Sequence, residues 1–311
     1  MKPLRPEENT FGIINIQTTY KCQMQCANCY LGNMLNNPKF SDIDPIRFED
    51  TLARLPERVE VRLIGAEPTM YQRLPDLIQI IRKCGHRPSL LTNGLKLRKE
   101  TYVKHLKDAG LFMLGLSMNG GLDDTLYQRF DNGKYAKQKM IALENCFKYR
   151  IVPHINIIVD PTNAHVVRDI QQYVIELSKK YGVKLGPKFP VYLRIKSIGK
   201  MGTHMISHTY NLDELVNIME KVSGTTLNRD YHMYGTKETN TCIFNWPVDT
   251  GTMYGKCTDW TVDDDGLPDA GSSRRGILTH EYMIEPFFEY YGDIDETRET
   301  RVERKKHRTA A

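Results

Sequence analysis

Residues 21–31 read KCQMQCANCYL and place three cysteines, Cys22, Cys26 and Cys29, within eight positions. They directly follow an apolar segment, 11–18, whose isoleucine-rich composition is typical of a buried strand. Three thiols on one tight loop can converge on a single metal centre, and the first histidine of the chain, His86, is far away. Because structural zinc normally takes four protein ligands, the pattern favours a centre with one open position, such as an iron–sulfur cluster with one iron free.

The first two thirds of the chain alternates apolar, strand-like segments with amphipathic, helix-like ones. We expect strands at residues 11–18, 59–64, 89–92, 113–118, 152–159 and 191–195. We expect helices at residues 46–55, 74–84, 99–109, 135–149, 165–181 and 211–222. Alternation of this kind predicts an α/β fold with a parallel sheet covered by helices, which is either a barrel or an open doubly wound sheet.

Composition sets broad limits on the class of protein. The chain has 311 residues, 40% of them hydrophobic, so a sizeable core can form. The formal charge of +5 permits a phosphate-bearing partner but does not require one. The total of seven cysteines is odd, and the four outside the loop are scattered, so they do not indicate a disulfide framework. No secretory signal and no run of about 18 apolar residues is present, so we expect a cytoplasmic protein without membrane contact.

The composition of the sequence changes after about residue 224, where the alternation of strand-like and helix-like segments stops and aromatic residues become common. We therefore divide the chain into a core at 1–224, a C-terminal extension at 225–292 that packs on the core and covers its substrate side, and a charged tail at 293–311. The tail is either an exposed helix or disordered.

The spacing Cys22-x3-Cys26-x2-Cys29 resembles the CxxxCxxC signature of radical S-adenosylmethionine (radical SAM) enzymes. The resemblance implies a partial (β/α)6 barrel in which the three thiolates hold three irons of a 4Fe–4S cluster. The amino and carboxylate groups of S-adenosylmethionine would chelate the fourth iron. Asn28 stands where the family often has an aromatic residue, at a position that contacts adenine largely through its backbone, and Tyr30 would contribute packing.

Further motifs of the family occur in the expected order, each at the end of a strand. Gly65-Ala66-Glu67-Pro68 resembles the family's GGEP motif, with alanine in place of the second glycine. The resemblance implies that this segment meets the methionyl amino group. Without the cysteines, Glu67 would read as a turn residue with a surface ion pair.

Polar residues of the later strands complete the predicted cofactor site. The resemblance assigns Ser117 and Asn119 to the ribose hydroxyls and nearby methionyl groups, and Asn93 is a candidate lining residue. Asn93 and Asn119 each precede a glycine and can equally form turns. Asn156 is either an inward-facing cofactor contact or a satisfied core amide. Arg194 either pairs with the methionyl carboxylate or closes the barrel end.

The C-terminal extension resembles a remnant of the cysteine-rich SPASM or twitch extension of some relatives. The stretch from Cys257 to Gly271 has the form of their hairpin, but Gly271 stands where a second cysteine is expected. Cys242 is the other cysteine of the region, and two are too few for an auxiliary cluster. Cys242 and Cys257 are therefore our candidates for a catalytic hydrogen donor.

The function implied by the resemblance is reductive cleavage of S-adenosylmethionine to a 5′-deoxyadenosyl radical. That radical would abstract a hydrogen atom from a peptide or a small metabolite, and a one-electron donor such as flavodoxin or ferredoxin would be a partner. One alternative is radical modification of a nucleotide or of a base in DNA or RNA, which the mild positive charge permits. A second alternative is a non-catalytic iron–sulfur protein.

Overall fold

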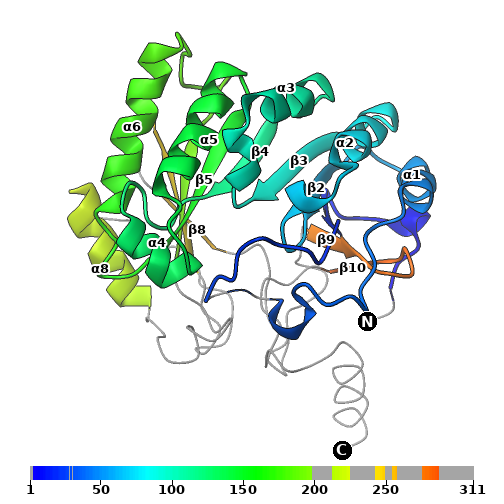
Figure 1. Ribbon diagram of the computed structural model, residues 1–311. Coiled ribbons are helices and arrows are strands. Elements are labelled where there is room, and N and C mark those ends of the chain that lie inside the picture. The colour runs from blue at the N-terminus through cyan, green and yellow to red at the C-terminus, as the bar shows by residue number, and fades with distance from the viewer. Residues whose placement is uncertain are drawn as a thin grey trace, which may run out of the picture.

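The structure is a computed structural model that describes residues 3–27, 29, 31–197, 212–224, 242–248, 254–257 and 275–286. Its centre is a ten-stranded mixed sheet (Figure 1). Six parallel neighbours form the middle of the sheet: β1 (Ile13–Gln17), β2 (Glu60–Ile64), β3 (Arg87–Thr92), β4 (Met113–Ser117), β5 (Val152–Val159) and β6 (Tyr192–Ser197).

The four remaining strands come from the C-terminal part of the chain and extend the sheet at both edges. They are β7 (Cys242–Pro247), β8 (Tyr254–Cys257), β9 (Arg275–Leu278) and β10 (Ile284–Pro286). β7 pairs antiparallel with β6, and β8 pairs antiparallel with β7. At the far edge β9 runs parallel to β1, and β10 pairs antiparallel with β9. The described parts of the predicted extension are thus continuous with the sheet, while our division into domains remains a prediction.

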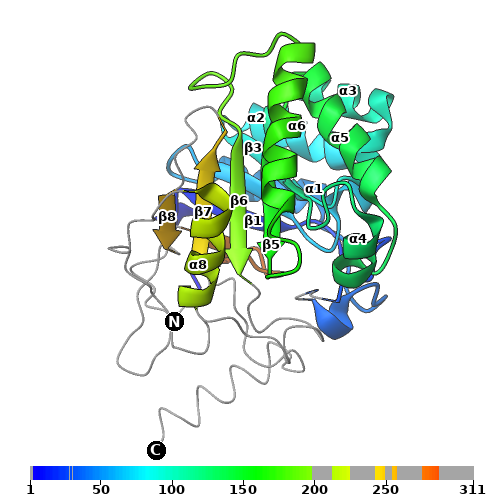
Figure 2. The ribbon, with the colours of Figure 1, turned by 90° about the vertical axis from the view of Figure 1, so that its left-hand side faces the viewer.

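Helices cover one face of the sheet (Figures 1 and 2). The longer ones are α1 (Pro45–Ala53), α2 (Leu74–Lys83), α3 (Glu100–Asp108), α4 (Asp124–Asp131), α5 (Ala136–Lys148), α6 (Val166–Lys180) and α8 (Leu212–Ser223). Short 3-10 turns are η1 (Pro6–Glu8), η2 (Gly32–Met34), η3 (Pro68–Met70) and η4 (Leu95–Arg98). All six predicted helices are confirmed to within about two residues at each end, whereas α4 was not predicted.

The helices form where the sequence supplies caps and an apolar stripe. Asp44 accepts a hydrogen bond from the backbone N–H of Ile46 at 2.8 Å and so caps α1. On α2 the buried residues recur with a helical period, which turns one face of the helix toward the sheet. They are Leu74, Leu77, Ile78 and Ile81. The helices and the outer face of the sheet together enclose the main core.

The opposite face of the sheet is concave. On β5 the side chains of His154, Asn156 and Ile158 are partly exposed, while the alternate residues between them are buried against helices. β2 and β6 lie four strand spacings apart, which would be about 19 Å in a flat sheet. Arg62 of β2 and Arg194 of β6 nevertheless line one pocket, so the sheet curls around an interior space. The predicted partial barrel is confirmed in this open form.

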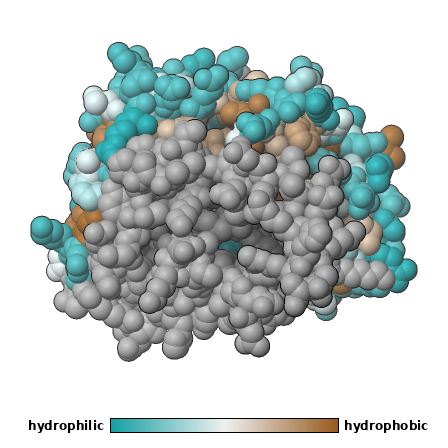
Figure 3. All heavy atoms as spheres, turned by 90° about the horizontal axis from the view of Figure 1, so that it is seen from below, coloured by the Kyte–Doolittle hydropathy of each residue, from teal (hydrophilic) through white to brown (hydrophobic). Residues whose placement is uncertain are grey.

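The surface of the described residues carries few large apolar side chains. Ile46, Phe112 and Leu122 are the exposed ones among them, and they lie on separate segments. Where Figure 3 is coloured, hydrophilic residues predominate and the hydrophobic spots are separate. Within the described part of the chain, no helix has the length and apolarity needed to cross a bilayer. The predicted hairpin between Cys257 and Gly271 lies mostly outside the described residues.

Candidate cofactor-binding site

The cysteine loop is attached to the sheet by hydrogen bonds that continue the pairing of β1 and β2 beyond the ends of both strands. Thr18 N–H donates to the Ile64 carbonyl at 2.8 Å, and Ala66 N–H donates to the Thr19 carbonyl at 3.0 Å. Glu67 N–H then donates to the Lys21 carbonyl at 3.1 Å, one residue before the first cysteine. The backbone of the segment resembling GGEP therefore sets where the loop begins.

Gly65 makes this approach possible. Its φ of +151° lies in a region that side-chain-bearing residues rarely adopt. A Cβ atom at this position would stand 2.7 Å from the carbonyl oxygen of Thr19, which is backbone and cannot rotate away. The first glycine of the motif is thus required by sterics, independently of any ligand.

Asn36 holds the first cysteine from the other side. Its side-chain oxygen accepts from the Cys22 N–H at 2.9 Å, and its side-chain nitrogen donates to the Cys22 carbonyl at 3.1 Å. Its own N–H donates to the Tyr20 carbonyl at 2.8 Å. Asn36 has a φ of 55°, a left-handed conformation that asparagine tolerates better than most residues. The two-sided contact fixes the backbone orientation of Cys22.

The three thiols are half-buried and lie close enough to influence one another electrostatically. Burial is the main cause that raises the pKa of the Cys22 thiol to about 11, and burial likewise raises the pKa values of Cys26 and Cys29. Cys22 Sγ also lies 3.7 Å from Asn93 Nδ2, at the carboxyl end of β3. A bound metal would be needed to hold these thiols as thiolates at neutral pH.

Cys22, Cys26 and Cys29 are the side chains available for the metal centre predicted from the sequence. In the described residues, no three histidine, cysteine or carboxylate side chains converge closely enough to hold one metal ion. In a 4Fe–4S cluster each thiolate binds a different iron, so the sulfur atoms need not meet at one point. Three thiols on one anchored loop are thus compatible with the four-iron cluster predicted from the sequence, with one iron left for another ligand.

Glu67 is a buried brace between β2 and β3. Its Oε1 accepts from the Thr69 N–H at 3.0 Å, from the Thr69 hydroxyl at 2.6 Å and from the Thr92 hydroxyl at 2.6 Å. Its Oε2 accepts from the Asn93 N–H at 2.7 Å and retains capacity for one more donor. The carboxylate thus positions Asn93, and its predicted contact with a methionyl ammonium would use Oε2.

Asn119 braces the next two strands. It is buried, its side-chain nitrogen donates to Asp131 at 3.0 Å, and its oxygen accepts from the Ile158 N–H at 3.0 Å. Its amide is thus engaged within the protein. Ser117, two residues earlier, lies at the end of β4 and pairs in register with Asn156 of β5.

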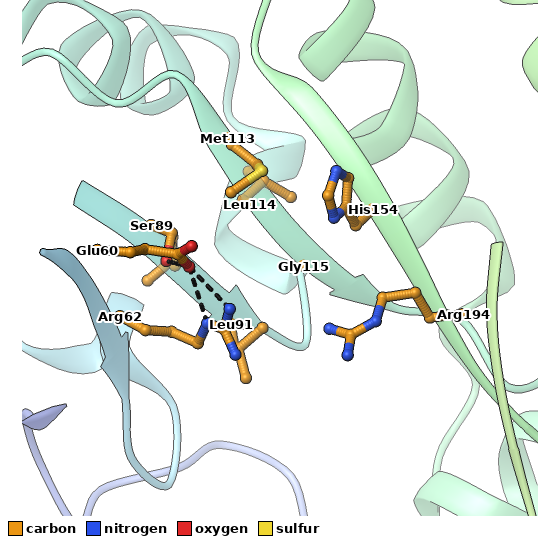
Figure 4. Close-up of a pocket in the computed structure, with 10 residues that line it drawn as sticks. Glu60, Arg62, Ser89, Leu91, Met113, Leu114, Gly115, His154 and Arg194 are labelled. Carbon is orange, nitrogen blue, oxygen red and sulfur yellow. Dashed lines mark hydrogen bonds and ion pairs between the residues drawn. The ribbon is translucent and has the colours of Figure 1, made fainter. Parts of the chain in front are cut away.

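The other predicted site residues that the structure describes lie at different depths along the strands. Pro68 begins η3, directly after Glu67. Arg194 pairs in register with Asn156 but lines a pocket deeper in the barrel (Figure 4).

Four other predicted site residues cannot be compared in the same way. Asn28 and Tyr30 lie outside the described residues, as do the side chains of Cys242 and Cys257. The backbones of these two cysteines are direct neighbours in the β7–β8 register. The cofactor contacts assigned to these residues remain predictions.

A fully buried ion pair lies beside Cys26. Lys139 Nζ contacts Asp131 at 3.0 Å, donates to the Ser117 carbonyl at 2.9 Å and lies over the ring of Tyr127. The cysteine loop reaches the same place, since Ala27 N–H donates to the carbonyl of Phe130 at 3.2 Å. The pair therefore connects α4, α5 and the end of β4 to the loop.

Neither the ion pair nor the Asn36 contact was predicted from the sequence. Lys139 follows Ala136 by three residues and precedes Leu143 by four, so it falls on the apolar face of its helix. A lysine on the apolar face of a helix indicates a buried charge that has a partner. Asn36 lies in an Asn-Asn-Pro turn and carries no comparable signal.

Comparison with known proteins identifies the family. The family model described as the radical SAM superfamily matches residues 16–174, which is 159 of the 311 residues. The chain belongs to the radical SAM superfamily. The matched segment includes the cysteine loop, the Gly65–Pro68 segment and strands β2 to β5.

Two curated relatives illustrate how far the similarity extends. The 7,8-dihydro-6-hydroxymethylpterin dimethyltransferase of Methanocaldococcus jannaschii is 32% identical over 168 residues, covering 52% of this chain and 32% of the relative. A GTP 3′,8-cyclase of Aquifex aeolicus is 28% identical over 220 residues, covering 67% of this chain and 64% of the relative. The chain thus spans less than two thirds of the length of these relatives.

The fold is similar to that of a solved structure. Streptococcus suis SuiB bound to the precursor peptide SuiA superimposes with a TM-score of 0.55 at 17% identity, over 68% of this chain and 45% of that chain. At this identity the likeness concerns the fold alone. The superfamily uses a 4Fe–4S cluster and S-adenosylmethionine, so the cofactors predicted from the sequence are confirmed for the family.

We expect Gly65→Ala to disturb the start of the cysteine loop. The added Cβ would collide with the Thr19 carbonyl, so unfolding free energy should fall by about 1–3 kcal/mol. Iron and sulfide bound per chain after anaerobic reconstitution should fall with it. Gly12→Ala is the matched control, since a Cβ there meets no atom within 4 Å. Equal denaturation midpoints and iron contents for the two variants would contradict the steric argument.

We expect Asp131→Asn to be strongly destabilising, because it leaves the charge of Lys139 buried without its counter-ion. The cost should be roughly 3–5 kcal/mol in chemical denaturation. Asp108→Asn is the control, because Asp108 forms an exposed ion pair with Lys104 and its loss should change stability by about 0.5 kcal/mol or less. The double variant Asp131→Asn/Lys139→Met should recover part of the loss; a double variant as unstable as the sum of the singles would argue against a coupled pair.

Proposed function

We propose that this chain is a radical SAM enzyme acting on a small molecule. The observation that supports the proposal most directly is the cysteine loop held at the carboxyl edge of a parallel sheet by the Gly65–Glu67 backbone. A 4Fe–4S cluster and S-adenosylmethionine, when bound, supply reductive cleavage of the sulfonium carbon–sulfur bond and a 5′-deoxyadenosyl radical. The electron would come from a one-electron donor such as flavodoxin or ferredoxin.

The role of the protein is to bind and orient. Cys22, Cys26 and Cys29 are the proposed ligands of three irons. The bracing by Glu67 and Asn119 keeps the strand ends around the loop in fixed positions, so a ligand at this edge meets a preorganised surface.

The substrate class is supported by the names of the relatives. Several are named as GTP 3′,8-cyclases, and another is named for a pterin. We therefore favour a small, polar metabolite, with a nucleotide as the form suggested by the cyclases. A peptide substrate is the alternative suggested by the SuiB complex. Because the chain covers only part of each relative, the whole activity is part of the proposal.

We expect anaerobically reconstituted protein with dithionite and S-adenosylmethionine to form 5′-deoxyadenosine, measured by mass spectrometry. Cys26→Ala should lose both the visible absorption of the cluster and the product. Cys84→Ala is the matched control, because this half-buried thiol follows α2 and lies outside the loop. It should retain both signals.

Two outcomes would overturn the proposal. Wild-type protein that binds the cluster but forms no 5′-deoxyadenosine would indicate a non-catalytic iron–sulfur protein. Full product formation by Cys26→Ala would remove this cysteine from the cluster. If the wild-type protein does form 5′-deoxyadenosine, deuterium transfer from labelled metabolite fractions into that product would identify the substrate.

A further inference from the structure

The side chain of Asn93 reaches the first cysteine of the loop. Asn93 directly follows β3, and its Nδ2 atom donates to Cys22 Sγ at 3.7 Å. Because sulfur is larger than oxygen, an N–H···S hydrogen bond is longer than a hydrogen bond to oxygen. The Met24 N–H donates to the same sulfur at 3.3 Å. Cys22 Sγ therefore accepts two N–H groups, one from the cysteine loop itself and one from the end of β3.

The other end of the Asn93 amide fixes its orientation. The amide oxygen accepts from the Leu95 N–H at 3.0 Å and from Gln23 Nε2 at 3.2 Å. A half-turn of the amide would bring its NH₂ group against the Leu95 N–H, so that two donors would face each other. The hydrogen bonds thus favour one orientation, and in that orientation the NH₂ group faces the sulfur of Cys22.

The backbone around Asn93 is held by Glu67. Glu67 Oε2 accepts from the Asn93 N–H at 2.7 Å, and Glu67 Oε1 accepts from the Thr92 hydroxyl at 2.6 Å. The Thr92 hydroxyl oxygen in turn accepts from the Gly94 N–H at 3.0 Å. Glu67 is 1% exposed and Thr92 is 4% exposed, so water has little access to these bonds. The Asn93 amide is therefore ordered before any cofactor binds.

The sulfur atoms of Cys22 and Cys26 have different surroundings. Burial is the largest cause that raises the pKa of the Cys22 thiol, and the N–H groups of Met24 and Asn93 act in the opposite direction. For Cys26, burial and then Asp131 both raise the thiol pKa. N–H donors stabilise the thiolate, whereas burial and a neighbouring anion disfavour it. Negative charge on Cys22 Sγ is thus supported by N–H groups of the protein.

We propose that Asn93 acts through Cys22 and raises the reduction potential of the cluster held by this loop, which favours its reduction by the one-electron donor. Hydrogen bonds to the ligand sulfurs are among the factors that set the potential of an iron–sulfur cluster, because they stabilise the additional negative charge of the reduced form. The inference rests on the proposed function and deepens it, since it gives the cluster a regulating contact.

A role of Asn93 in the turn alone would require only its side-chain oxygen. Aspartate and serine at this position both retain an oxygen that can accept from the Leu95 N–H, so both preserve the turn. Neither supplies the amide donor. Aspartate has a charged oxygen in its place, and the serine hydroxyl ends one bond short of it. The variants Asn93→Ser and Asn93→Asp therefore separate the turn from the hydrogen bond to sulfur.

The test measures the potential of the cluster separately from turnover. Anaerobically reconstituted protein is titrated with dithionite and redox mediators, without S-adenosylmethionine, and EPR gives the reduced fraction at each potential. At a fixed potential, Asn93→Ser should lower the ratio of reduced to oxidised cluster roughly 3- to 10-fold, and 10-fold corresponds to about 59 mV for a one-electron couple. Asn93→Asp should lower the ratio further, because its carboxylate adds negative charge beside Cys22.

Asn37→Ser is the matched control. The Asn37 oxygen accepts from the N–H two residues later, that of Lys39, at 3.0 Å, as the Asn93 oxygen does from Leu95. Its nitrogen, however, donates to the Asn33 carbonyl at 3.2 Å on an exposed turn. The midpoint potential of this variant should equal that of the wild type. Iron and sulfide contents and circular dichroism check that each variant is loaded and folded. Equal midpoint potentials in Asn93→Ser, Asn93→Asp and Asn37→Ser overturn the proposal.

A measurement on the wild type keeps the test decisive if the Asn93 variants take up no cluster. The protein is labelled with ¹⁵N in the asparagine side chains, and the reduced cluster is studied by pulsed EPR. An N–H···S hydrogen bond transmits spin density from the cluster to the donor nitrogen, so we expect a ¹⁵N hyperfine coupling. Absence of this coupling overturns the proposal.

The outcomes for this inference and for the proposed function are distinguishable. An unchanged potential in the Asn93 variants, together with weaker binding of S-adenosylmethionine, would assign Asn93 to the cofactor contact and overturn the inference alone. A lowered potential in these variants supports the inference. If the wild type then forms no 5′-deoxyadenosine, that result counts against the proposed function alone.

Discussion

The arrangement of the site depends on one short stretch of backbone pairing. The β1–β2 ladder does not end with the strands but continues through the Thr19–Ala66 and Lys21–Glu67 hydrogen bonds. Only glycine at position 65 permits this approach, because the Thr19 carbonyl occupies the place of a Cβ. As a result, the cysteine loop leaves the sheet at a fixed point and in a fixed direction. A loop tethered at one end would not hold three thiols in register for a cluster.

Buried polar side chains connect the ends of the neighbouring strands along the carboxyl edge of the sheet. Glu67 connects the ends of β2 and β3, Asn119 connects the end of β4 to β5, and Lys139 connects the β4 carbonyl to α4. Each group would be costly without its partners, so the set is stable only when all strand ends are in place. Glu67 and Asn119, which the family resemblance assigns to the cofactor, thus act as structural braces in this fold. The resemblance alone gave no sign of that role, because hydrogen bonding between strand ends is non-local.

Features that depend on local interactions could be predicted from the sequence, whereas features that depend on contacts between distant segments could not. The six parallel strands and six of the helices were predicted because hydrophobic periodicity is local. The pairing of β9 with β1 joins Ile13 to Arg275 and could not be read from either segment alone. Helix α4 was missed although Asp123 caps it, since only four of its eight residues are buried. The cysteine cluster is contiguous and was predicted, whereas Arg62 and His154 come together only because the sheet curls.

The carboxyl edge of the barrel and the deeper pocket contain different sets of buried polar groups. At the carboxyl edge, hydrogen bonds fix the backbone of the cysteine loop, and three of the braces have ionisable side chains that are almost fully buried: Glu67, Asp131 and Lys139. In the deeper pocket, Glu60 accepts hydrogen bonds from the Arg62 guanidinium and from the Ser89 hydroxyl, and His154 and Arg194 complete the polar lining. Replacing such partly buried charges with apolar side chains of similar size would often stabilise a protein. The buried charges of this fold are therefore kept at some cost in stability, which is offset only while every hydrogen-bond partner is in place.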